Sequence, residues 1–115
     1  MKLNNVADTT VAVCNMTEKE QMKRSQRLRE ELFAEVEEVR ELEDGYALQL
    51  PASNKMMQKI SEHVWIESQC CPFFEFEITL KPDNGPIWLK FKGGKKVKEL
   101  IGQDMEKLKK AVSSG

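Results

Sequence analysis

Four residues that can bind metal ions or transfer protons lie within one short stretch of this sequence: His63, Glu67, Cys70 and Cys71. The apolar spacing around them predicts a helix over residues 54–71, in which each residue turns about 100° from the one before. That turn places His63, Glu67 and Cys70 within an arc of roughly 60°, with Cys71 beside them. The stretch therefore predicts one shared site.

The adjacent cysteines allow three interpretations. Cysteine often packs as a small hydrophobic residue, so Cys70 and Cys71 could belong to the core. Thiolates also bind soft metal ions such as zinc, although the cysteines here are not spaced as in a zinc finger. A metal site would draw on Cys14, Glu67, Cys70 and Cys71, with His63 in reserve. Alternatively, Cys14 could form a reversible disulfide with Cys70 or Cys71.

Glu67 falls within the apolar stripe of the predicted helix, between Met56 and Ile60 on the helical wheel. An ionised carboxylate among apolar side chains is costly unless it is paired, protonated or bound to a metal ion. A pair with Arg29, a metal ion, or a helix rotated so that Glu67 reaches the protein's edge would each relieve that cost. For Arg29 itself we expect a guanidinium that reaches solvent along its aliphatic stem, and a pair with Glu67 is the sharper alternative.

The pattern Glu-x-x-Cys-Cys-Pro-Phe-x-x-Phe runs from Glu67 to Phe76. It resembles the pattern of a family of small, largely uncharacterised bacterial proteins and domains appended to regulators. The resemblance covers roughly residues 12–102 and extends through further motifs: Cys14-Asn-Met-Thr17, Glu43-Asp-Gly45-Tyr46, Ile87-Trp-Leu89 and Lys92-Gly-Gly94. His63 is not part of that pattern. The resemblance implies no established activity, and its cysteines suggest metal or thiol chemistry.

Length, charge and cysteine count narrow the class of protein. With 115 residues we expect one domain over 1–115, with a loose start at 1–8. The net charge of −1, with lysines and glutamates interspersed, gives no indication of nucleic-acid binding. The apolar runs are too short for a membrane span or a signal peptide, which predicts a cytoplasmic protein. Three cysteines are an odd number and predict free thiols or a metal site instead of disulfides.

Alternating patterns predict an α+β fold. Helical spacing predicts helices at 17–34, 54–71 and 97–112, and the core stripe of the first helix begins at Met22. Strand-like alternation predicts strands at 9–14, 36–42, 46–50, 74–80 and 87–92. This order favours a two-layer sandwich in which helices cover one face of a mostly antiparallel sheet. The first six elements follow the ferredoxin-like order, to which a strand and a C-terminal helix are added.

Catalytic signatures give no positive indication of an enzyme, because the chain has one histidine, no glycine-rich phosphate loop and no Ser-His-Asp pattern. We therefore predict a small domain that binds a soft metal ion, zinc for example, or senses through its thiols at the cysteine and glutamate cluster. The alternative hypothesis is a protein-interaction or regulatory module whose cysteines are structural. Its partner would be another protein or a second copy of the chain.

Overall fold

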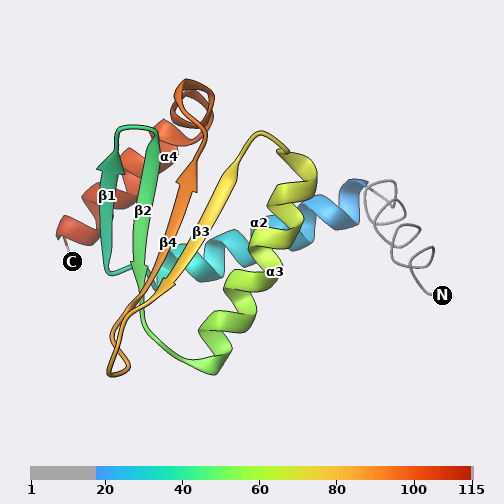
Figure 1. Ribbon diagram of the computed structural model, residues 1–115. Helices are drawn as coiled ribbons and strands as arrows, with labels where there is room; N and C mark the ends of the chain where they lie inside the picture. Colours follow the sequence, from blue (N-terminus) through green and yellow to red (C-terminus); the bar gives the residue numbers. More distant parts are fainter. Residues whose placement is uncertain (1–17, 115) are drawn as a thin grey trace.

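The computed structural model describes residues 18–114, which form three helices and one four-stranded antiparallel sheet (Figure 1). The elements follow in the order α2 (Glu18–Ala34), β1 (Glu38–Leu42), β2 (Gly45–Leu50), α3 (Asn54–Cys70), β3 (Glu75–Leu80), β4 (Ile87–Lys92) and α4 (Lys95–Ser114). The strand expected at 9–14 lies outside the described residues. The other predicted elements are present, and none of their boundaries differs from the prediction by more than two residues.

The sheet has the strand order β1-β2-β4-β3, and every neighbouring pair is antiparallel. It is built from two hairpins, β1–β2 and β3–β4, that meet through β2 and β4. This arrangement confirms the predicted α+β class. The ferredoxin-like order is not confirmed, since β4 lies between β2 and β3, where that order would hold the strand expected at 9–14.

The two hairpins approach each other closely at Gly45, which begins β2. A Cβ atom at this position would collide with the backbone carbonyl of Phe91 on β4, so only glycine fits here. The preceding turn is also tied to β4, because the Asp44 carbonyl accepts hydrogen bonds from the amides of Gly93 and Gly94, each at 3.0 Å. These contacts hold the two halves of the sheet together at one end.

The hydrophobic core lies on one face of the sheet. The strand register aligns Val39, Leu48 and Leu89 across β1, β2 and β4, and all three are buried. The helices complete this core with Leu32, Met56, Ile60, Val97 and Met105. In Figure 1, α2 and α3 lie side by side, and α4 packs against β1 and β2. The helices thus cover one face, as the sequence predicted.

The opposite face of the sheet is charged. Glu77 on β3 pairs with Lys90 and Lys92 on β4, at 3.7 Å and 2.9 Å. The Lys92 hydrogen bond and charge lower the pKa of the Glu77 carboxyl.

Strand β3 is an edge strand on which Ile78 and Leu80 stay exposed. Within residues 18–114, no helix has the length and apolar character that crossing a membrane requires.

Candidate functional site

Helix α3 carries most of the predicted site residues and ends between the two cysteines. It begins at an N-cap, where the Ser53 hydroxyl accepts a hydrogen bond from the Met56 amide at 3.0 Å. At the other end, the Cys71 amide donates to the Glu67 carbonyl at 2.7 Å, and Pro72 prevents the helix from continuing. Cys70 is therefore the last helical residue and is exposed, whereas Cys71 is half-buried outside the helix.

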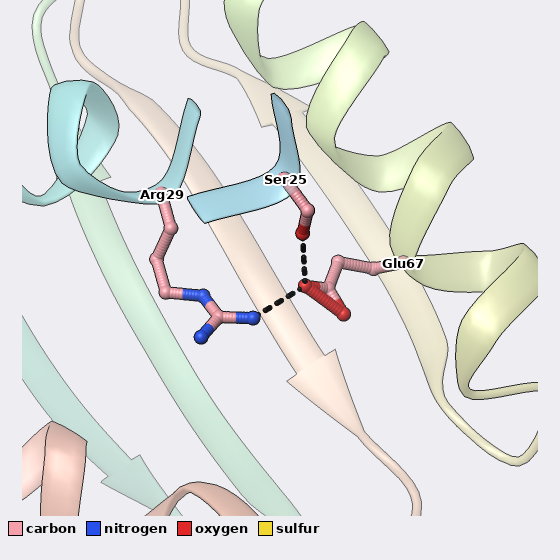
Figure 2. A network of polar contacts seen from close by, with 3 residues as sticks. All are labelled: Ser25, Arg29 and Glu67. Atoms are coloured by element: carbon pink, nitrogen blue, oxygen red, sulfur yellow. Dashed lines mark hydrogen bonds and ion pairs between the residues drawn. The ribbon is translucent and has the colours of Figure 1, made fainter. Parts of the chain in front are cut away.

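Glu67 forms an ion pair with Arg29 of α2. The Arg29 Nη2 atom donates to Glu67 Oε2 at 2.8 Å, and the Ser25 hydroxyl donates to the same oxygen at 3.4 Å (Figure 2). The Glu67 side chain is 12% exposed and that of Arg29 43% exposed. Both sequence expectations hold in part: Arg29 reaches toward solvent, and its guanidinium still provides the partner that the buried carboxylate requires.

Helices α2 and α3 are held together by further ion pairs along the same interface. Arg24 pairs with Glu62, and Lys59 pairs with Glu31 at 3.7 Å. The side chains of these pairs are 27% to 62% exposed, so they add little to stability individually. They lie along the same interface of α2 and α3 as the Arg29–Glu67 pair.

His63 is the buried polar residue of the site, with only 3% of its surface exposed. Its Nδ1 atom has no hydrogen-bond partner among the described residues. The ring stands edge-on to Phe91, with centroids 6.3 Å apart. Burial lowers the pKa of His63, and although the Glu67 charge opposes this, Arg29 adds to it. The imidazole is therefore neutral near pH 7.

An inner cavity of about 200 Å³ lies between the helices and the sheet. Its walls come from α2, α3, β3, β4, α4 and the segment after α3. The lining residues are Arg29, Phe33, His63, Glu67, Cys71, Phe74, Phe76, Phe91, Leu100, Ile101, Asp104 and Met105. Four of the five phenylalanines in the chain are in this set. The inner cavity is thus mainly apolar, and the Arg29–Glu67 pair is part of its lining.

An outer groove of about 710 Å³ adjoins the inner cavity. Both are lined by Arg29, Phe33, Glu67, Cys71 and Asp104, so the ion pair lies where the groove and the cavity meet. Cys70 lines the groove and does not line the cavity. Cys71 therefore lines both the groove and the cavity, whereas the adjacent Cys70 lines the groove alone.

The structure brings together three of the predicted site residues, His63, Glu67 and Cys71, around the inner cavity. Cys70 lies beside them, and Cys14 falls outside the described residues. Burial raises the pKa of the Cys71 thiol, and the charges of Glu67 and Cys70 raise it further. Over residues 18–114, no group of three or more His, Cys, Asp or Glu residues is placed to hold a metal ion. The metal site, which includes Cys14, stays a prediction.

Sequence reasoning missed the aromatic wall and Asp104. Phe33, Phe91 and Asp104 come from three different elements, α2, β4 and α4, and no local spacing links them. The one available signal was the phenylalanine cluster directly after the cysteines, which was interpreted as the start of a strand. Comparisons with known proteins returned no match, whether to a protein-family model, a curated protein or a solved structure.

Proposed function

We propose that this domain binds a small, mainly apolar molecule in the inner cavity. The observation that carries the proposal is the convergence of four phenylalanines on a cavity that is also lined by the Arg29–Glu67 ion pair. Ligand sites in proteins are typically apolar cavities with a few polar groups that orient the ligand. An apolar cavity of about 150 Å³ accommodates benzene. A cavity of about 200 Å³ suits one aromatic ring with a short substituent.

The burial of His63 also supports a binding role. An unpaired buried nitrogen such as Nδ1 costs about 1–3 kcal/mol, which folding alone gives no reason to keep. Departures from optimal packing and pairing are most common at functional sites. The outer groove supplies the approach to the cavity, past the Arg29–Glu67 pair that both share.

Filling the inner cavity should prevent binding. Ile101→Trp introduces a larger side chain into the cavity wall on α4, and we expect it to weaken the binding of small aromatic probes at least about tenfold. Benzyl alcohol is a suitable probe, and its affinity can be measured by ligand-observed NMR. Leu100→Trp, at a more exposed position of the same wall, is a second blocking variant should Ile101→Trp fold poorly.

The matched control is Ile78→Trp, the same substitution on strand β3, outside the residues that line the cavity. It should bind the probe as the parent does. Equal affinity in the parent, Ile101→Trp and Leu100→Trp would place the probe elsewhere and contradict the proposal. So would a parent protein that binds no aromatic probe of this size at millimolar concentration.

A soft metal ion at the cysteines is the second candidate function. The observation in its favour is that Cys70 and Cys71 both line the outer groove, where Cys14 would supply a third thiolate. Because the pKa of Cys71 is raised, a bound ion must displace its proton, so affinity for Zn²⁺ should increase from pH 6.5 to pH 8.

Zinc titration of the reduced full-length protein, followed by calorimetry, tests this second function. We expect one ion per chain, and loss of binding in Cys71→Ser. Cys70→Ala should stay folded, because Cys70 is exposed and its side chain contributes little packing. If the reduced parent binds no zinc at either pH, this second function is wrong.

A further inference from the structure

We infer that the inner cavity selects small organic cations, such as aromatic or alkyl amines in their ammonium form. This inference rests on the proposed function, since it names the class of molecule that the same cavity binds. Of the residues that the structure describes, three charged ones line the cavity: Glu67 and Asp104 are acidic, and Arg29 is basic. His63, from α3, is neutral because burial lowers its pKa. The lining therefore carries one negative charge more than it has positive charges.

The excess negative charge resides at Asp104 on α4. Glu67 is compensated by Arg29, whereas no ion pair among the described residues involves Asp104. Glu67 retains some capacity as well, because both of its hydrogen bonds from Ser25 and Arg29 end on Oε2. This leaves Oε1 available to accept a charge-assisted hydrogen bond from a ligand ammonium group.

The aromatic wall favours a cation too. Phe74, Phe76 and Phe91 form a row with centroids 5.7 Å and 5.6 Å apart, and all three line the cavity. The faces of aromatic rings attract cations, most strongly where water is excluded. At the exposed end of this row, Phe73 already has the Lys96 ammonium 5.3 Å from its ring centroid. The phenylalanine cluster thus interacts with one cation of the chain itself.

An anionic ligand fits this site less well. Among residues 18–114, Arg29 is the one charged basic group that lines the cavity, and its Nη2 already donates to Glu67 at 2.8 Å. An anion bound at the remaining guanidinium N–H groups would still lie beside the carboxylates of Glu67 and Asp104. Strands β3 and β4 contribute only phenylalanines to the lining and therefore no compensating positive charge.

Three ligands of nearly the same size and different charge test the inference. Benzylamine is a cation at pH 7, benzyl alcohol is neutral, and benzoate is an anion. Calorimetry on the full-length protein at low salt should show benzylamine binding at least about tenfold more tightly than benzyl alcohol, with benzoate the weakest. Asp104→Asn, at an exposed position, should weaken benzylamine about tenfold and benzyl alcohol much less.

Asp83→Asn is the matched control, because Asp83 is an exposed aspartate in the turn before β4 and does not line the cavity. It should change neither affinity. If the parent binds benzyl alcohol as tightly as benzylamine and Ile101→Trp weakens both, the cavity binds ligands without selecting cations, and only this inference is overturned. If Asp104→Asn binds benzylamine as the parent does, the inference is overturned as well. If none of the three ligands binds, the proposed function fails together with it.

Discussion

Replacing Arg29 by methionine should lower the free energy of unfolding by about 2 kcal/mol at pH 7. The substitution keeps an unbranched aliphatic side chain at this position of α2 and removes the charge opposite Glu67. That carboxylate is only 12% exposed, so it would be left largely buried without a cation. Breaking a fully buried pair costs about 3–5 kcal/mol, and the 43% exposure of Arg29 reduces this because water can replace part of the interaction. Urea denaturation measures the change.

Glu67→Gln should cost less than Arg29→Met, because the half-exposed guanidinium can turn to water whereas the carboxylate cannot. The double variant Arg29→Met/Glu67→Gln should therefore be more stable than Arg29→Met alone, with a coupling energy of about 1 kcal/mol or more in the double-mutant cycle. Arg24→Met is the matched control. Arg24 also pairs with a glutamate across α2 and α3, but its side chain is 62% exposed, so we expect a loss below about 0.5 kcal/mol. Equal losses for the two methionine variants would mean that Glu67 is solvated.

The Arg29–Glu67 pair illustrates what could be predicted from the sequence. Helical periodicity is local, so it placed Glu67 in an apolar stripe and His63 on the same side, and both are buried in the structure. The cost of a buried charge then required a partner, and Arg29 was the leading candidate in the chain. The helix predicted over 54–71 is one residue shorter in the structure, because Pro72 disfavours a helical Cys71, and the two cysteines therefore lie on either side of the helix end.

The cavity could not be predicted, because its walls depend on tertiary packing. Phe33 belongs to α2 and Phe91 to β4, and only the sheet order and the helix positions bring them together.

Met22 is a residue whose burial was predicted and is not observed. It shares the predicted apolar stripe of α2 with buried Leu28, yet it is 68% exposed, because periodicity identifies a face of a helix and not how far along that face the neighbouring elements extend. The expected core position of Met22 was therefore wrong.

Lowering the pH from 7.5 to 5 should destabilise the protein through His63. Its pKa in the folded state is lowered, mainly by burial, from an ordinary value of 6.5. Between that value and the lower folded pKa, the unfolded chain binds a proton that the folded chain does not bind. The free energy of unfolding therefore rises with pH in this window and falls as the pH drops below 6.5, by at most about 1.4 kcal/mol per pH unit for one proton.

This window can be assigned to one residue, since the chain has a single histidine. The lowered pKa values of Glu41 and Glu77 change the free energy of unfolding only below pH 4.5, and the raised pKa of Cys71 changes it only above pH 9. His63→Leu should therefore flatten the dependence of stability on pH between 5 and 7. At pH 7 it should be as stable as the parent or more stable, because it replaces a buried nitrogen that lacks a partner with an apolar group of similar size. Urea denaturation of both proteins at pH 5, 6 and 7 measures the slopes. A parent slope that persists in His63→Leu would mean that the imidazole takes up its proton as readily in the folded state as in the unfolded state, and that the cavity is open to water beside it.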